Sequence, residues 1–166
     1  MRLKSNNGFE MIVMEPSKNK LVFEITKSWF EMNENCPALV ISSTKDQIIL
    51  FPLCYSDDEG KTNELSLARS ILNAFNCDWY VFSSYSEISG EKYVINLYCD
   101  QIKTDIEIFK VVNGHLEKIN MKWKKAEGSI SMLLEPLNLA LQEKLVIRRF
   151  YFAYMESFGI EKSHLS

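Results

Sequence analysis

Residues 57–62 combine three acidic side chains with a glycine, a lysine and a threonine. A Gly-Lys-Thr triplet between an apolar strand and a helix is the setting of a phosphate-binding P-loop. That motif needs a glycine where this chain has Tyr55, and the acidic residues would repel a phosphate from the backbone amides. A calcium-binding EF-hand loop needs acidic residues at alternate positions, whereas Asp57, Asp58 and Glu59 are consecutive. The sequence therefore predicts a solvated acidic loop over residues 55–61.

A second group of polar side chains follows an apolar run that reads as a strand: Ser84, Tyr85 and Glu87. Binding residues often gather where strands end, and hydroxyls with a carboxylate can bind a polar ligand. The chain has no histidine near this group and no Gly-x-Ser-x-Gly elbow around its serines. We therefore predict no catalytic residue, and we predict a set of binding residues formed by Asp57, Asp58, Ser84, Tyr85 and Glu87.

Histidines and cysteines give little support for a metal site or a nucleophile. His115 follows an Asn-Gly turn and His164 is in the C-terminal tail. The cysteines form no C-x-x-C pair, and each lies beside or within an apolar run, where a reduced thiol packs like a small hydrophobic group. We predict core thiols in a reducing, cytoplasmic compartment, and neither a cofactor nor a metal. The four cysteines are Cys36, Cys54, Cys77 and Cys99.

Composition favours one globular domain. The chain has 166 residues, of which 46% are hydrophobic and 25% are charged, so a sizeable core is available. The formal charge of −3 disfavours general affinity for nucleic acids or anionic membranes. No apolar run approaches the ~18 residues of a membrane span, and the short apolar stretch near the N-terminus is too short for a signal peptide.

Hydrophobic spacing predicts three helices. Apolar residues recur every three or four positions over residues 18–35 and again over residues 62–76. A C-terminal helix is predicted to begin near Ser131, or after Glu135 with Pro136 at its first position, and Gly159 is a plausible stop. In this helix, Arg148 and Arg149 neighbour several aromatic residues, a pattern typical of a helix that docks its aromatics and extends its arginines to solvent.

Apolar and β-branched runs predict the strands, and the Ser89-Gly90 and Asn113-Gly114 pairs predict tight turns between them. The predicted strands are residues 9–14 (an edge strand or an arm), 38–42, 47–53, 79–84, 91–100, 105–112 and 115–123. We predict an α+β fold, in which a mainly antiparallel sheet of five or six strands packs with an N-terminal, a middle and a C-terminal helix. Residues 1–166 would form a single domain, with residues 1–16 as an arm or edge strand and residues 160–166 as a flexible tail.

Four short segments follow one another in a characteristic order: Pro37-Ala38-Leu39-Val40, Leu50-Phe51-Pro52, Asp57-Asp58-Glu59-Gly60-Lys61 and Val81-Phe82-Ser83-Ser84. Over residues 38–98 this order resembles a set of uncharacterised small α+β proteins of phages and prokaryotes. The chain departs from their pattern at Tyr85, which replaces the usual acidic residue. The resemblance implies the fold and an origin in a phage or mobile element, and it brings no known activity.

These observations favour a non-enzymatic protein–protein interaction module, acting through a protein partner or as a homodimer. Seven methionines, seven tyrosines and no specific catalytic motif support it, and the resemblance implies an accessory or inhibitor role. One alternative is a small hydrolase or ligand-binding enzyme that uses carboxylates and hydroxyls at the end of the central strand. Another alternative is a nucleic-acid-binding protein, for which the best basic residues are Lys118, Lys122, Lys124 and Lys125.

Overall fold

Six antiparallel strands form the sheet around which the chain folds, in the order β4-β3-β5-β6-β7-β8. The computed structural model describes residues 2–4, 10–12, 18–32, 38–100, 104–119 and 133–160. The strands of the main sheet are β3 (Ala38–Ser43), β4 (Ile48–Leu53), β5 (Trp79–Ile88), β6 (Glu91–Asp100), β7 (Thr104–Val112) and β8 (His115–Ile119). Two short strands, β1 (Arg2–Lys4) and β2 (Glu10–Ile12), pair separately. The α+β prediction is confirmed, with three helices: α1 (Lys18–Met32), α2 (Asp58–Ala74) and α3 (Leu141–Glu156).

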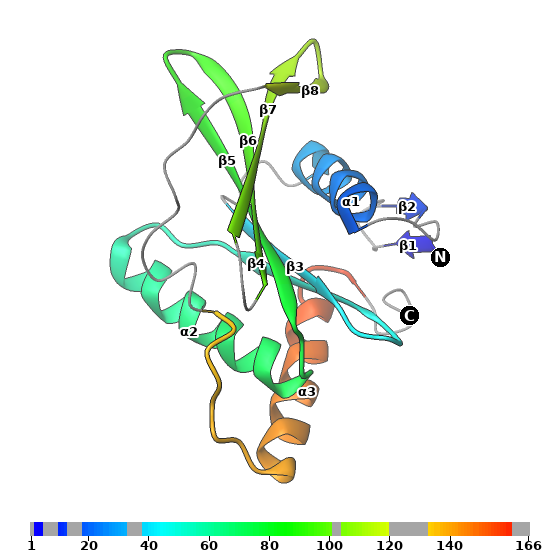
Figure 1. Ribbon diagram of the computed structural model, residues 1–166, viewed down its shortest axis with the longest axis vertical. Helices are drawn as coiled ribbons and strands as arrows, with labels where there is room; N and C mark the ends of the chain where they lie inside the picture. Colours follow the sequence, from blue (N-terminus) through cyan, green and yellow to red (C-terminus); the bar gives the residue numbers. More distant parts are fainter. Residues whose placement is uncertain are drawn as a thin grey trace.

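The helices cover both faces of this sheet (Figure 1). On one face, Thr26 of α1 reaches Ser83 of β5, and Ile25 and Trp29 are buried. Successive strand residues point to opposite faces, so Val40, Phe51 and Phe82, which lie opposite one another in β3, β4 and β5, face the other way. Stacking of Phe51 on Tyr154 of α3, with ring centroids 4.9 Å apart, places α3 on that second face.

Beyond β3, the outer part of β5 continues with β6, β7 and β8 as an arm (Figure 1). Strand β3 pairs with β5 only over residues 81–84, whereas β6 pairs with β5 along its whole length to Ile88. The predicted strand end at Ser84 is therefore wrong, because pairing with β6 carries β5 four residues further. The turns follow the sequence closely: Ser89, Asn113 and Asn76 have positive φ angles of 54°, 51° and 55°.

Helix α2 begins four residues before the predicted start at Thr62. Asp57 is its N-cap, and its Oδ1 accepts a hydrogen bond from the Gly60 amide at 2.6 Å. Asp58 and Glu59 then occupy the first turn, where negative charge is favourable at the positive end of the helix dipole. The predicted acidic loop is thus mostly the first turn of a helix.

Removal of the Asp57 carboxylate is expected to lower the free energy of unfolding by about 1 kcal/mol, because the Gly60 amide loses its acceptor. Urea denaturation of Asp57→Ala measures this effect. Asp57→Asn keeps a capping oxygen and is the matched control, so it should stay close to the wild type. Equal losses in both variants would mean that the charge, and not the cap, matters at this position.

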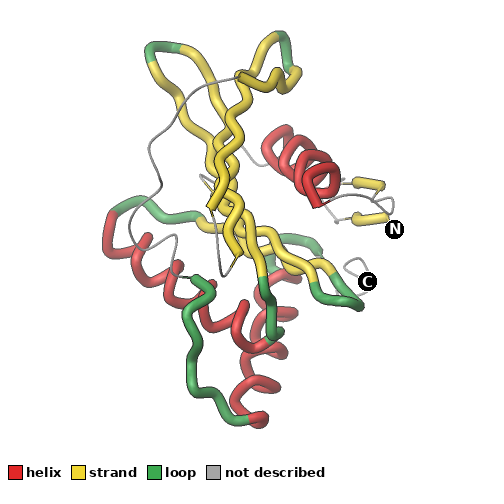
Figure 2. Tube along the Cα trace, viewed as in Figure 1, coloured by secondary structure: helices red, strands yellow, loops and turns green. Residues whose placement is uncertain are grey.

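Helix α3 begins at Leu141, later than either predicted start, because tertiary contacts hold the preceding segment in a non-helical conformation. Arg69 of α2 donates hydrogen bonds to the carbonyls of Glu135 and Pro136 at 3.0 and 3.1 Å. Asn73 bonds the Glu135 carbonyl and the Leu137 amide. Figure 2 shows residues 133–140 as a loop that leads from beside α2 to the start of α3.

Candidate functional site

Two predicted binding residues, Asp57 and Asp58, serve the N-terminus of α2. The Asp57 carboxylate caps the helix, and the Asp58 carbonyl accepts a hydrogen bond from the Thr62 hydroxyl at 3.0 Å. A side chain on residue 60 would place its Cβ 3.0 Å from Asp57 Oδ1, so Gly60 makes room for the cap. The glycine and threonine of the Gly-Lys-Thr triplet thus have structural roles.

The other three predicted binding residues lie along β5 and are divided between its faces. Ser84 points to the face of α3, whereas Tyr85 and Glu87 point to the face of α1. Ser84 and Glu87 therefore do not converge on one substrate. Asp57 is engaged elsewhere, because its carboxylate caps α2 through the Gly60 amide.

A buried polar cluster lies next to this stretch, under α1. The Ser83 hydroxyl donates a hydrogen bond to Asn96 Oδ1, and Thr26 lies 3.5 Å from both Ser83 Oγ and Asn96 Nδ2. All three residues are fully buried. Because this serine has no base as a partner in the cluster, the arrangement fixes α1 on the sheet and does not activate a nucleophile.

The cysteines depart from the prediction at one position. Cys54 follows the end of β4 in an exposed position and is disulfide-bonded, so its assignment as a core thiol is wrong. Cys77 and Cys99 are free, and burial raises the pKa of both thiols, which makes them poor nucleophiles. Cys36 is outside the described residues. A disulfide is typical of oxidising compartments, so the cysteines no longer support a cytoplasmic location.

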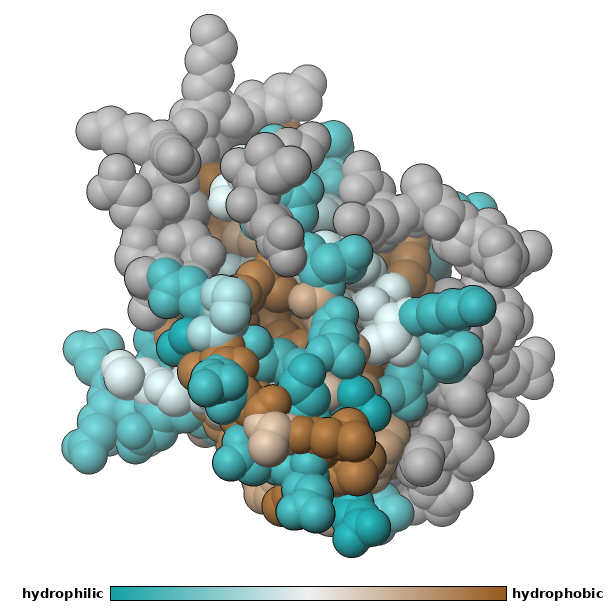
Figure 3. Space-filling model, turned by 60° about the horizontal axis from the view of Figure 1, so that its bottom comes forward, coloured by the Kyte–Doolittle hydropathy of each residue, from teal (hydrophilic) through white to brown (hydrophobic). Residues whose placement is uncertain are grey.

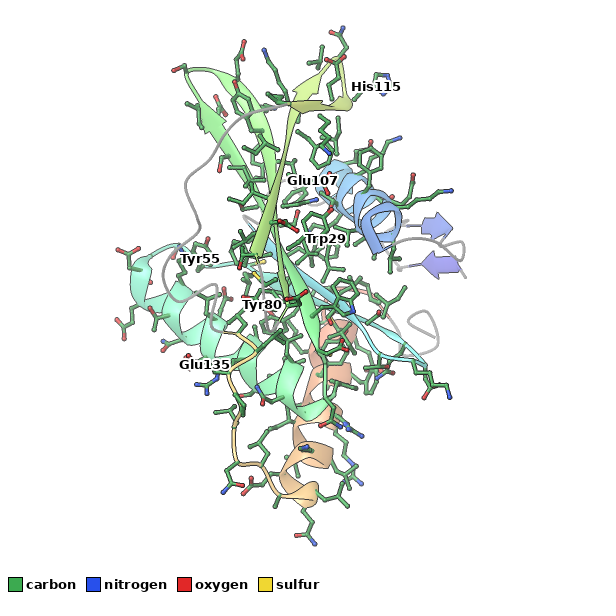
Figure 4. All side chains as sticks on the ribbon, viewed as in Figure 1. Trp29, Tyr55, Tyr80, Glu107, His115 and Glu135 are labelled. Atoms are coloured by element: carbon green, nitrogen blue, oxygen red, sulfur yellow. The ribbon has the colours of Figure 1, made fainter. Side chains whose placement is uncertain are left out.

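Basic and metal-binding groups offer no further site among the described residues. Lys118 pairs with Glu107 at 3.3 Å, and the other three lysines of the nucleic-acid alternative lie outside the described residues. His115 is exposed at the outer end of the arm, far from Glu135 beside α2 (Figure 4). Within the described part of the chain, no group of three His, Cys, Asp or Glu residues is placed to hold a metal ion. No helix there is long and apolar enough to span a membrane.

The inner face of α3 is anchored to the edge strand β4 by two tyrosines. The fully buried Tyr151 hydroxyl accepts a hydrogen bond from the Leu50 amide at 2.8 Å, and the Tyr154 hydroxyl donates one to the Pro52 carbonyl at 3.1 Å. On an edge strand, the amide and carbonyl groups of every second residue point away from the sheet. When these groups have no partner, they can pair with a strand of another molecule. Tyr151 and Tyr154 satisfy two of these groups, and Arg148 adds a bond to the Ala74 carbonyl at 2.7 Å.

Alkaline pH is expected to loosen these contacts. Burial raises the pKa of Tyr154 to about 12, and burial also raises the pKa values of Tyr80, Tyr98 and Tyr151 above the ordinary value of about 10. As pH rises, these hydroxyls lose their protons at lower pH in the unfolded chain than in the folded one. Their contribution to the free energy of unfolding is therefore complete below a pH of about 10 and decreases as pH rises further. Urea midpoints measured across this range should decline, and less steeply in Tyr151→Phe, which lacks one of the ionising groups. A midpoint independent of pH would contradict the burial of these hydroxyls.

The outer face of α3 is apolar and exposed. We call Leu141, Leu145, Val146 and Phe150 the α3 outer face. Their exposed fractions are 70%, 43%, 63% and 45% for Leu141, Leu145, Val146 and Phe150. Figure 3, which brings the lower end of the molecule forward, shows hydrophobic side chains at the surface between hydrophilic ones. Beside this face lies a cavity of about 340 Å³ lined by Phe75, Leu145, Arg149 and neighbouring residues. Several exposed apolar side chains on one helix indicate an interaction surface.

The sequence indicated that aromatic residues of α3 pack on the core, but it did not indicate the exposed apolar residues on the other side of this helix. The aromatics Tyr151, Phe152 and Tyr154 dock on the core as predicted, whereas Phe150 points outward. The signal for the outer face was present in the apolar residues Leu141, Leu145 and Val146. A helix with apolar residues nearly all round requires partners on more than one side.

Comparisons with known proteins add no relative: no protein-family model, no curated protein and no solved structure matches this chain.

Proposed function

We propose that this chain is a protein-interaction module that acts as a homodimer, in which the α3 outer face packs antiparallel against the same face of a second copy. The observation that carries the proposal is the symmetry of the exposed residues along α3. In an antiparallel pair centred between Leu145 and Val146, Leu141 of one copy comes level with Phe150 of the other. Leu145 of each copy then comes level with Val146 of its partner, so the exposed apolar residues of the two copies flank the pair at matching heights.

The polar residues of α3 follow the same symmetry. Gln142 comes opposite Arg149 in this pairing, and the Gln142 side-chain oxygen can accept a hydrogen bond from the guanidinium. Arg149 of each copy therefore meets a neutral side chain and no like charge at the centre of the pair. Two copies of one helix face can thus satisfy each other without a second kind of partner.

The free energy gained by burying the α3 outer face indicates how tightly two copies can associate. Complete burial of a Val, Leu or Phe side chain contributes about 1.5–3 kcal/mol, and these side chains have roughly half of that left to gain. Eight such side chains in a dimer contribute on the order of 8 kcal/mol, against an association cost of about 4–15 kcal/mol. The dimer is therefore expected to be reversible, and the cavity beside Leu145 must also be filled by the second copy.

Sedimentation velocity over a concentration series tests the proposal. The wild-type chain is expected to shift from the mass of one copy toward that of two as concentration rises. A strict monomer at every concentration would refute the homodimer. A monomer that instead gave a stable complex with a different protein would assign the α3 outer face to a heterologous partner.

A further inference from the structure

We propose that the cavity between α1 and the arm binds a small amphipathic carboxylate, a molecule with an apolar chain and a single anionic head. The cavity has a volume of about 430 Å³, within the range of about 300–1,000 Å³ typical of small-molecule sites. It lies on the α1 face of the sheet, opposite the face that carries α3. The inference is therefore independent of the proposed homodimer.

Apolar side chains from both sides line the body of this cavity. Phe30 of α1 stacks on Tyr85 of β5, with ring centroids 6.1 Å apart and planes 28° apart. Val94 lies opposite Tyr85 in the β5–β6 register, and Val111 lies opposite Leu116 in the β7–β8 register. Residues opposite each other in a sheet share a face, so the arm presents a continuous apolar wall to α1. Such a wall favours the hydrocarbon part of a ligand.

Charged side chains lie around this apolar body. Lys27 comes from α1 and Lys92 from β6, so the two lysines contribute to the lining from opposite walls. Among the described lining residues, these two lysines stand against one carboxylate, Glu31, in a chain whose formal charge is −3. The Tyr85 hydroxyl is a further hydrogen-bond donor in the lining. This charge pattern favours an anionic head.

Neighbouring carboxylates restrict that head to a single charge. Glu31 follows Lys27 by one helical turn, and Glu87 lies opposite Lys92 in the β5–β6 register. Each lysine therefore has an acidic neighbour, and a dianion such as a phosphate monoester would meet more repulsion than a carboxylate. The chemistry of the site thus fits a medium-chain fatty acid.

Titration calorimetry of the full chain with hexanoate, octanoate and decanoate tests chain recognition. Each added methylene that enters the apolar cavity is expected to raise affinity about fourfold, until the chain fills the available volume. 1-Octanol is the matched neutral probe and should bind more weakly than octanoate. Absence of saturable binding by any of the acids, or equal binding of octanoate and 1-octanol, would overturn the proposal.

Two kinds of variant locate the site. The double substitution Lys27→Gln and Lys92→Gln is expected to weaken octanoate binding about tenfold and to leave 1-octanol binding unchanged. Lys45→Gln, in the exposed turn between β3 and β4, is the matched control and should bind octanoate as the wild type does. Val111→Trp fills the cavity and should abolish binding of both probes. Octanoate binding that survives both the double substitution and Val111→Trp would place the ligand elsewhere and refute the assignment.

Discussion

Truncation of Tyr151 to alanine is expected to lower the free energy of unfolding by about 4 kcal/mol. Tyr151 is fully buried, and its ring packs edge-on against Phe75 with centroids 5.2 Å apart. Its hydroxyl also accepts the hydrogen bond from the Leu50 amide on the edge of the sheet. The substitution therefore opens a cavity and leaves a buried amide unsatisfied at once. Chemical denaturation followed by circular dichroism measures the loss.

Tyr151→Phe separates the two contributions. It keeps the ring and removes only the acceptor, so the expected loss is about 1–3 kcal/mol for one buried amide left without a partner. Tyr154→Phe is a useful comparison, because this side chain is only half-buried and its bond to the Pro52 carbonyl is longer. A Tyr151→Phe protein as stable as the wild type would show that the Leu50 amide does not depend on this hydroxyl.

Replacement of Val146 by glutamate is expected to abolish self-association, with a dissociation constant at least ~100-fold higher. In the antiparallel pair, the new carboxylate would be buried close to the centre of the interface, and the symmetry introduces it twice. The folded monomer should be unaffected, because Val146 is 63% exposed. Sedimentation velocity gives the association constant, and thermal unfolding at low concentration confirms that the monomer is intact.

Ile88→Glu is the matched control for this substitution. Ile88 is 51% exposed, so the same chemical change occurs at a similarly exposed apolar residue. It lies at the end of β5 in the arm, far from α3 (Figure 1). This variant should associate as the wild type does. Equal loss of association in both variants would point to general apolar stickiness and not to a defined α3 interface.

The sequence predicted elements whose formation depends on local chemistry. Asn113-Gly114 adopts the positive φ angles that a tight hairpin turn needs, and Asn76 adopts one at the end of α2. The two β-branched runs around Ser43–Asp46 form the expected hairpin of β3 and β4. In these cases the residue types alone favour one backbone conformation, so no distant contact had to be known.

Elements whose limits depend on distant residues were not predicted correctly. The start of α3 at Leu141 is set by Arg69 and Asn73, more than sixty positions earlier, which bind the backbone of residues 135–137 outside any helix. The extent of β5 is set by pairing with β6. The sequence does not show that these distant residues are in contact. For that reason the predicted start of α3 and the predicted end of β5 differ from those in the structure.

The candidate binding residues divide in the same way. Tyr85 does line a cavity, but its neighbours there come from α1, β6, β7 and β8, not from the Asp57–Asp58 segment. Asp57 has a local role as a helix cap, a role that its position before Gly60 and Lys61 could have indicated. The α3 outer face could not be identified from the sequence, because it depends on knowing that Tyr151 and Met155 lie on the buried side of the helix.

Disulfide cross-linking across the proposed interface tests the central claim most directly. One variant carries Gln142→Cys and the other Arg149→Cys, and the two are mixed under mild oxidation. The antiparallel pair predicts a cross-linked heterodimer between the two variants and little cross-linking of either variant alone. The reason is that like positions are separated by seven helical residues, roughly 10 Å at 1.5 Å per residue. The wild type, with its native cysteines, gives the background. Cross-linking of each variant to itself, with no excess in the mixture, would contradict the antiparallel α3 dimer.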